Sequence, residues 1–487
     1  MDVFNHKGKN MFAQHLTNST TTLNGAKAYK SSLNAVLDLF SMGITADGLT
    51  QTSLIGKAFK EEPVLALKCI LYLRDVRQGQ GNRDIFRRAM SYLISKEPAI
   101  VNFLIPHIPE IGRWKDVFEL YGKSPKLDHI ILELSRKVWK EDGLWAKWFP
   151  RQSKFHKDFA SYMDYTVGEM RRTVAKLTKV IETQMCNRQW HEVNYESVPS
   201  IANIKYSKAF LRNDSSRRQN FLDKVLSGDK TAKATVSYPH DILNMLLVTP
   251  WSAYYNVDKR NPQVKSANAL WSQLPNYMPE DSKFNILPII DTSGSMTRQA
   301  DGTTSSCLSI AAGLGIYMAE RNSGSYKNLW MNFSTRPKAY FLKGDLLSEK
   351  VASLDYNNWG HSTDLDAAMQ MVLDSARKYS EDAPKVILIV SDMEFNGTVR
   401  FTNYEKFKAD FAALGLEMPT TIFWRVNTAT VQQPALLDDK KVMLINGYSP
   451  IILKEVLNGN ILDYTPEGAM RAILEPKYTF IDEALKG

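Results

Sequence analysis

One turn of the sequence collects side chains that could bind a hard cation. Within NILPIIDTSGSMTRQ (residues 285–299), Asp291, Ser293 and Ser295 occupy alternate positions directly after an apolar run. Side chains at alternate positions of an extended chain point to the same side, so these oxygens share one face. A turn of this composition that leads into a helix is typical of a site for a divalent cation or a phosphate.

Two other segments offer oxygens to the same place. Thr363 lies in NNWGHSTDLD, just before a helix predicted to begin near Leu365, and Asp392 ends the apolar run KVILIVSD. Two carboxylates and three hydroxyls suit Mg²⁺ or Mn²⁺, with water or a partner's oxygen completing the shell, whereas zinc prefers softer ligands. The alternative is structural, because Ser and Asp in such a turn also cap helices.

The same residues do not fit the common hydrolase motifs. A phosphatase of the DxDx type would need a carboxylate where Ser293 stands, and Asp291 and Thr297 stand where a G-x-S-x-G elbow needs glycine. No P-loop lysine motif occurs. A metal-dependent nuclease is disfavoured, because the sequence offers one ion position and no second carboxylate-rich segment. We therefore predict a binding module without catalytic residues.

From residue 284 onwards, short β-rich runs alternate with helical stretches. The expected strands are FNILPIID, NLWMNFS, KVILIVSD, TTIFWRVN and KVMLING, and the helices between them include SSCLSIAAGLGIYMAE, LDAAMQMVLDSARKY and YEKFKADFAALG. This alternation predicts a doubly wound, mainly parallel sheet with helices on both faces. Ligands of such sheets bind at the carboxyl ends of the strands, which is where Asp291 and Asp392 lie.

From about residue 28 to residue 250, apolar residues recur at helical spacing instead. In RDIFRRAMSYLI the arginines stay off one apolar face, which consists of Ile85, Phe86, Ala89, Met90, Leu93 and Ile94. Similar patches occur in PVLALKCILYLRDV, LDHIILELSRKVW and YTVGEMRRTVAKLTKVI. Short helices with Gly, Pro or Asn breaks between them predict stacked antiparallel helix pairs, a HEAT-like repeat domain.

These patterns divide the chain into five parts. We expect a polar lead-in over 1–27, a helical-repeat domain over 28–270, a linker over 271–283, an α/β domain with the metal site over 284–460, and a C-terminal helical tail over 461–487.

Charge is distributed unevenly along the chain. Residues 1–283 carry 41 Lys and Arg against 28 Asp and Glu, whereas residues 284–487 carry 20 against 24. A basic half often marks a polyanion-binding surface, although a solvated helical face with excess lysine is the commoner cause of any single cluster.

Three segments of the basic half could contact RNA. In RDVRQGQGNRDIFRR, Gly79 and Gly81 would let backbone amides approach an anion. WAKWFPRQSKFHK and KYSKAFLRNDSSRRQNFLDK mix aromatic residues with cations, which suits stacking on single-stranded bases and contact with phosphates, although tryptophans of helical repeats more often lie in the core. The residues predicted to contact RNA are Arg77, Arg83, Arg87, Arg88, Lys147, Arg151, Lys154, Lys205, Lys208, Arg212, Arg217 and Arg218.

Composition limits the class of protein. A 44% hydrophobic fraction and 23% charged residues are ordinary for a soluble globular protein. No apolar run reaches the roughly 18 residues of a membrane span, and the first residues have no signal-like apolar core. Three widely spaced cysteines, Cys69, Cys186 and Cys307, favour unpaired thiols in a reducing compartment. We predict a cytoplasmic protein that does not contact membranes.

The motifs also resemble known families. DTSGSM, with a downstream Thr and SDMEF, looks like the metal-ion-dependent adhesion site of a von Willebrand factor A domain, which implies that Asp291, Ser293, Ser295, Thr363 and Asp392 hold one Mg²⁺ or Mn²⁺. With LRDVRQGQGNRDIFRRAM and PEIGRWKDVFELY in front, the whole chain resembles an uncharacterised family in which a helical domain precedes an A domain. That layout is similar to the Ro-type (TROVE) RNA-binding proteins, whose helical repeats form a ring closed by an A domain.

Taken together, these features predict a non-catalytic module that binds structured or single-stranded RNA. The metal would bridge to an anionic oxygen of the partner. The alternative is a protein-interaction scaffold, in which an Asp or Glu of a protein partner completes the metal shell and the basic surface is incidental.

Overall fold

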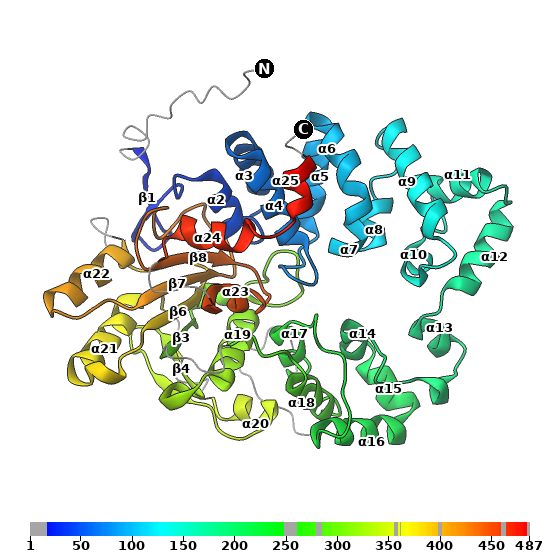
Figure 1. Ribbon diagram of the computed structural model, residues 1–487. Coiled ribbons are helices and arrows are strands. Elements are labelled where there is room, and N and C mark those ends of the chain that lie inside the picture. Colours follow the sequence, from blue (N-terminus) through cyan, green and yellow to red (C-terminus); the bar gives the residue numbers. More distant parts are fainter. Residues whose placement is uncertain are drawn as a thin grey trace. The chain divides into compact units, whose positions relative to one another are not determined.

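The structure is a computed structural model of the chain, and it describes residues 17–247, 261–278, 285–354, 359–360, 362–397, 402–458 and 464–484. The chain forms two compact units (Figure 1). Met1–Cys69 together with Ser237–Gly487 make up the α/β unit, and Ile70–Val236 make up the helical unit. Within the described ranges, every helix is too short or too polar to cross a membrane.

The α/β unit is built on a six-stranded sheet. Its strands are β3 (Ile286–Asp291), β4 (Leu329–Phe333), β5 (Ala339–Phe341), β6 (Val386–Ser391), β7 (Thr420–Arg425) and β8 (Val442–Asn446). They lie in the order β5-β4-β3-β6-β7-β8, and all neighbours are parallel except β5, which is antiparallel to β4. The expected mainly parallel sheet is confirmed. The three-residue edge strand β5 was missed, because it is too short and too exposed to show an apolar pattern.

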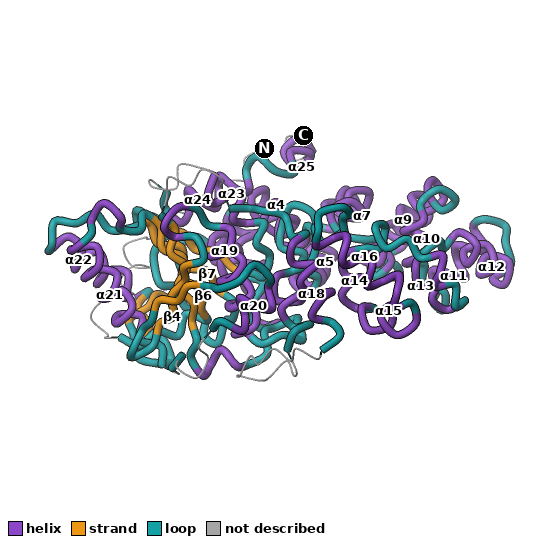
Figure 2. The backbone as a smooth tube through the Cα atoms, turned by 90° about the horizontal axis from the view of Figure 1, so that it is seen from below, coloured by secondary structure: helices purple, strands orange, loops and turns teal. Residues whose placement is uncertain are grey.

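Helices cover both faces of this sheet. The described α-helices that follow β3 in this unit are α19 (Cys307–Arg321), α20 (Leu347–Ala352), α21 (Leu365–Lys378), α22 (Asn403–Ala413), α23 (Ile452–Asn458), α24 (Pro466–Leu474) and α25 (Thr479–Ala484). Figure 2 shows α21 and α22 on one side of the strands and α19 on the other. Leu287 and Ile289 pack into the core cluster of α21 and α22, whereas Ile290 packs against Gly315 of α19. Because both faces are buried, the strands read as continuous apolar runs.

Segments from the expected lead-in, helical domain and linker belong to the α/β unit. They form β1 (Ser19–Thr21), β2 (Lys27–Tyr29), α2 (Ala35–Met42), α3 (Gly48–Glu61), α17 (Pro239–Leu243) and α18 (Val264–Ser272). The backbones of Tyr29 and Gln433 exchange hydrogen bonds of 2.9 and 2.7 Å. Trp271, placed in the linker by the sequence, is 2% exposed and donates its indole N–H to Glu320 at 2.6 Å.

The expected boundaries at residues 28, 271 and 284 therefore differ from the division into compact units. Local periodicity identifies helices and strands, but it carries no information about pairing between residues hundreds of positions apart. Residues 1–16 of the lead-in, 279–283 of the linker, and 461–463 and 485–487 of the tail lie outside the described residues. The described part of the tail is helical, as predicted, and consists of α24 and α25.

The described residues of the helical unit form helices joined by loops. The chain enters it within α4 (Pro63–Arg74) and continues through α5 (Asp84–Lys96), α6 (Pro98–Leu104), α7 (Ile108–Ile111), α8 (Trp114–Phe118), α9 (Pro125–Val138), α10 (Gly143–Trp148), α11 (Lys154–Tyr162), α12 (Val167–Leu177), α13 (Ile181–Cys186), α14 (Ser200–Lys205), α15 (Ser207–Asn213) and α16 (Ser215–Leu226). The predicted helical character is confirmed, and its HEAT-like repeat remains a prediction. Aromatic rings fill part of its core; Trp145 and Phe155 both pack on Phe159, with centroids 5.2 and 5.4 Å away.

The close packing of α19 on β3 makes a stability prediction. A Cβ added at Gly315 would lie 2.7 Å from Ile290 Cγ1, next to the strand end that carries Asp291. We expect Gly315→Ala to lower the free energy of unfolding by about 1–3 kcal/mol through overpacking, measured by urea denaturation. Gly143→Ala is the control, because an added Cβ meets nothing within 4 Å there. Equal urea midpoints for Gly315→Ala and the parent would contradict this packing.

Candidate functional site

Parallel pairing places two carboxylates at one edge of the sheet. Strand β3 pairs with β6 in parallel, with Ile290 opposite Val390, so Asp291 and Asp392 follow at the carboxyl ends of adjacent strands. Both side chains are buried, at 0% and 1% exposure. The register of the sheet therefore brings these two residues to adjacent strand ends, as the sequence predicts.

Asp291 is held by hydrogen bonds from two sides. Its Oδ1 accepts from the backbone N–H of Ser293 at 2.9 Å, and its Oδ2 accepts from the hydroxyl of Ser391 at 2.5 Å. Burial, followed by the charge of Asp392, nevertheless raises the pKa of Asp291 well above its usual value. The ionised form is thus disfavoured unless a positive charge lies nearby.

Asp392 is less well satisfied than Asp291. Its Oδ1 accepts from the backbone N–H of Glu394 at 3.2 Å, but its buried Oδ2 has no hydrogen-bond partner among the described residues. Burial raises the pKa of Asp392, and the hydroxyl of Ser295 acts in the opposite direction. Met393, the residue after Asp392, has a φ of +66°, a conformation that a bulky residue rarely adopts and that is often found at functional sites.

The serines of the turn complete a group of four predicted ligands. Ser293 Oγ lies 3.0 Å from Ser295 Oγ. The hydroxyl of Ser293 acts to lower the pKa of Asp291, and the hydroxyl of Ser295 acts to lower the pKa of Asp392. The structure thus brings together Asp291, Ser293, Ser295 and Asp392.

Thr363, the fifth predicted ligand, lies on a loop tied to the segments on either side. The carbonyl of Trp359 in this loop accepts from Thr292 Oγ1 at 3.1 Å and from Asn332 Nδ2 at 2.7 Å. The carbonyl of Thr363 accepts from the backbone N–H of Asn396 at 3.0 Å. Its hydroxyl donates to Asn396 Oδ1 at 2.7 Å. Thr363 is 5% exposed, and none of its described hydrogen bonds goes to the other four predicted ligands.

Sequence reasoning missed several residues around the site. Ser391 donates to Asp291 and also accepts from the N–H of Met393 at 2.9 Å. It directly precedes Asp392 in SDMEF but was not predicted to belong to the site. Arg425 ends β7 and is 2% exposed; burial lowers its pKa to about 10, while the charges of Glu394 and Asp392 act against that shift. The sequence signal that could have identified Arg425 is a charged residue at the end of an apolar strand, as in TTIFWRVN.

The residues present fit a divalent cation. Asp392 Oδ2 is a buried charged oxygen without a described partner, and the nearby donors of the turn are hard oxygens. No group of three or more His, Cys, Asp or Glu suited to a metal is found within the described ranges. A cation here would therefore depend on hydroxyls as well as on the two carboxylates.

In the helical unit, the structure corrects the expectation for the glycine-rich turn. The amides of Gln80, Gly81 and Asn82 donate to carbonyls of the α4 end and its following residue, at 3.0, 3.0 and 2.8 Å. A Cβ on Gly79 would lie 2.0 Å from the carbonyl oxygen of Tyr72, so glycine is needed for close packing. These three amides cap a helix and are not available to an anion.

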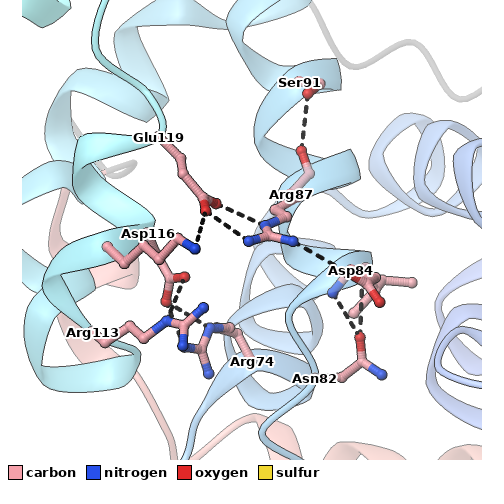
Figure 3. Close-up of polar contacts among 10 residues, drawn as sticks. Arg74, Asn82, Asp84, Arg87, Ser91, Arg113, Asp116 and Glu119 are labelled. Atoms are coloured by element: carbon pink, nitrogen blue, oxygen red, sulfur yellow. Dashed lines mark hydrogen bonds and ion pairs between the residues drawn. The ribbon is translucent and has the colours of Figure 1, made fainter. Parts of the chain in front are cut away.

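Several predicted RNA-contacting cations already have partners, and Figure 3 shows one of them, Arg87. Arg87 binds Glu119 through two hydrogen bonds of 2.7 Å. Neighbouring Arg74 forms a buried pair with Asp116, at 3.0 and 2.5 Å. Outside Figure 3, the other engaged cations are Lys147 with Glu182, Arg151 with Thr178, Lys154 with Asp128, and Arg217 with Asp214 and two backbone carbonyls.

Arg218 was predicted wrongly as a surface residue. Its side chain is 0% exposed, donates to Asn203 Oδ1 at 3.2 Å, and lies over the rings of Tyr195 and Phe210 at 5.0 and 5.3 Å. Trp145 is likewise fully buried, which supports the core alternative for that aromatic segment. Six of the predicted cations are exposed and are not among the cations with partners described above. They are Arg77, Arg83, Arg88, Lys205, Lys208 and Arg212.

This chain is similar to two families of unknown function, to an uncharacterised viral protein and to one solved structure. Residues 285–478 match a family described as a domain of unknown function (DUF7788), and residues 22–121 and 159–284 match another (DUF2828). An uncharacterised protein of Acanthamoeba polyphaga mimivirus is 24% identical over 95% of this chain and 88% of its own length. Among solved structures, the Ro (RSR) protein of Deinococcus radiodurans is similar at a TM-score of 0.48 and 13% identity, covering 91% of this chain and 100% of that chain.

The crowded carboxylates predict that the site opposes stability when no metal is present. Asp392→Asn keeps the side-chain size and an oxygen for the N–H of Glu394 but removes one buried charge. We expect the metal-free free energy of unfolding to rise by about 1 kcal/mol, the equivalent of a pKa shift of one unit, measured by urea denaturation in chelator. Asp374→Asn, at an exposed position of α21, should leave it unchanged. A less stable Asp392→Asn chain would contradict this prediction.

Proposed function

We propose that this chain is a non-catalytic binding module in which the α/β unit holds one Mg²⁺ or Mn²⁺. The observation that carries the proposal is the pair of adjacent buried carboxylates of Asp291 and Asp392. In this pair, Oδ2 of Asp392 has no described hydrogen-bond partner. Removing two like charges from water is unfavourable, and a nearby dication offsets it. The groups that would hold the ion, directly or through water, are the side chains of Asp291, Ser293, Ser295, Thr363 and Asp392.

Each residue of the site has a distinct task. Asp291 keeps its orientation through Ser293 and Ser391, so its position does not depend on the ion. Asp392 is oriented by the backbone N–H of Glu394 and the hydroxyl of Ser295, and its Oδ2 has no described partner, which suits a ligand. When bound, the ion offers an open coordination position to an anionic oxygen of a partner.

We propose RNA as that partner. The helical unit, Ile70–Val236, carries 30 Lys and Arg against 19 Asp and Glu, whereas the rest of the chain carries 31 against 33. The net positive charge of the protein is thus confined to this unit. Its exposed cations can contact phosphates, which supply most of the affinity of sequence-independent RNA binding. A protein partner that offers a carboxylate to the ion is the competing outcome of the tests below.

The metal proposal predicts cation-dependent stabilisation. Mg²⁺ or Mn²⁺ at a hundredfold excess over Kd should add about 2.7 kcal/mol to the parent, because the ion binds only the folded state. Asp291→Ala should abolish the rise in melting temperature, each variant being compared with its own metal-free sample. Asp374→Ala removes an exposed carboxylate of the same unit and should respond like the parent. Equal metal-induced shifts for Asp291→Ala and the parent would refute the site.

The RNA proposal predicts a charge- and salt-dependent affinity. The fluorescence anisotropy of labelled single-stranded RNA should report binding by the full chain that weakens with salt, with a slope of about 0.7 per phosphate neutralised. Five substitutions to Gln should weaken binding and flatten that slope; they replace Arg77, Arg83, Arg88, Lys208 and Arg212.

A charge-matched variant provides the control for the RNA experiment. It carries Gln at five exposed lysines of the α/β unit, namely Lys343, Lys378, Lys385, Lys408 and Lys440, and should keep most of the parent's slope. Asp291→Ala should also keep most of it, because the ion supplies one local contact. Absence of RNA binding at low salt, or an unchanged slope in the first variant, would favour the protein partner.

A further inference from the structure

The turn of the β1–β2 hairpin docks beside the proposed metal site. Leu23 donates its backbone N–H to Glu394 Oε2 at 2.7 Å, two residues after Asp392. Thr22 Oγ1 donates to the carbonyl of Phe395 at 2.8 Å. A segment near the start of the chain therefore contacts the residues that follow Asp392, although it lies more than three hundred residues from these partners in sequence.

Asn24, at the tip of this turn, contacts a proposed ligand directly. Its Nδ2 donates to Thr363 Oγ1 at 2.9 Å and to the carbonyl of Glu394 at 2.6 Å. The Thr363 hydroxyl in turn donates its one proton to Asn396 Oδ1 at 2.7 Å. Two amide side chains thus determine the orientation of this hydroxyl.

The hydrogen-bonding capacity of the Thr363 hydroxyl determines how many of its lone pairs remain free to bind an ion. Threonine Oγ1 has one proton and two lone pairs. The proton points to Asn396, and one lone pair accepts from Asn24, which leaves a single lone pair. Without Asn24 the hydroxyl would keep two open acceptor positions and could rotate its proton among several partners. With Asn24 in place, the oxygen has one direction left in which to accept or to coordinate.

We infer that Asn24 is a positioning residue of the metal site, which orients Thr363 Oγ1 toward the ion from the N-terminal hairpin. The inference rests on the proposed function, because it assumes that Thr363 is a ligand. Groups that hydrogen-bond to metal ligands typically change metal affinity by 10–100-fold when they are removed. Asn24 therefore belongs to the binding site, and residues 285–478 by themselves lack it.

The test measures Mn²⁺ affinity of the full chain by isothermal titration calorimetry. Asn24→Ala should weaken Mn²⁺ binding about tenfold or more. Thr22→Val is the matched control, because it also removes two hydrogen bonds, those to Phe395 and from the N–H of Ala26, but leaves Asn24 in place. Its Mn²⁺ affinity should stay within about twofold of the parent, even where its metal-free melting temperature falls as far as that of Asn24→Ala.

A double-mutant cycle separates positioning from general structural support. In a Thr363→Val background, Asn24→Ala should cause no further loss of Mn²⁺ affinity, because the hydroxyl that it orients is absent. An additive loss, an equal loss in Thr22→Val, or an unchanged affinity in Asn24→Ala would overturn the inference while leaving the metal site intact. A parent chain that binds no Mn²⁺ would instead refute the proposed function, and this inference with it.

Discussion

The withdrawal of two carboxylates from water at the ends of adjacent strands is the constraint on which the rest of the α/β unit depends. Asp291 and Asp392 are buried because β3 and β6 are central strands covered on both faces. Hydrogen bonds from Ser391 and from backbone amides stabilise their ionised forms in part, and the buried guanidinium of Arg425 adds a positive charge nearby. The raised pKa of both acids indicates that these contributions do not fully offset burial.

The helical unit uses many of its charges for its own structure. Arg74 with Asp116 and Arg87 with Glu119 join neighbouring helices, and Arg218 lies among aromatic rings in the core. Removing one partner of a buried pair such as Arg74 and Asp116 typically costs about 3–5 kcal/mol, so these arginines are constrained by stability. Only the exposed remainder of the basic residues is free to serve a partner, and it is a smaller set than the sequence clusters suggest.

Connections between distant segments bring the site together. The hairpin at residues 19–29 reaches the loops after β6, and the loop of Thr363 is tied both to the end of β3 and to Asn396. Two of the three loops that carry proposed ligands, those of Thr363 and Asp392, are thereby contacted by a fourth segment, the hairpin. Such second contacts restrict ligand side chains to one orientation, which a turn of small hydroxyl residues could not do alone.

The sequence by itself determined the parallel strands of the sheet, most helices and the carboxyl-end position of Asp291 and Asp392, because apolar runs and helical periodicity are local properties that each segment carries within itself. It could not show which of the basic residues are buried, since a helical arginine such as Arg218 looks the same in sequence whether it faces water or a cluster of rings. Nor could it show that Asn24 donates a hydrogen bond to Thr363, or that residues 17–69 belong to the α/β unit. Those contacts were decided by tertiary structure alone, because they join residues whose spacing in the chain carries no periodic signal.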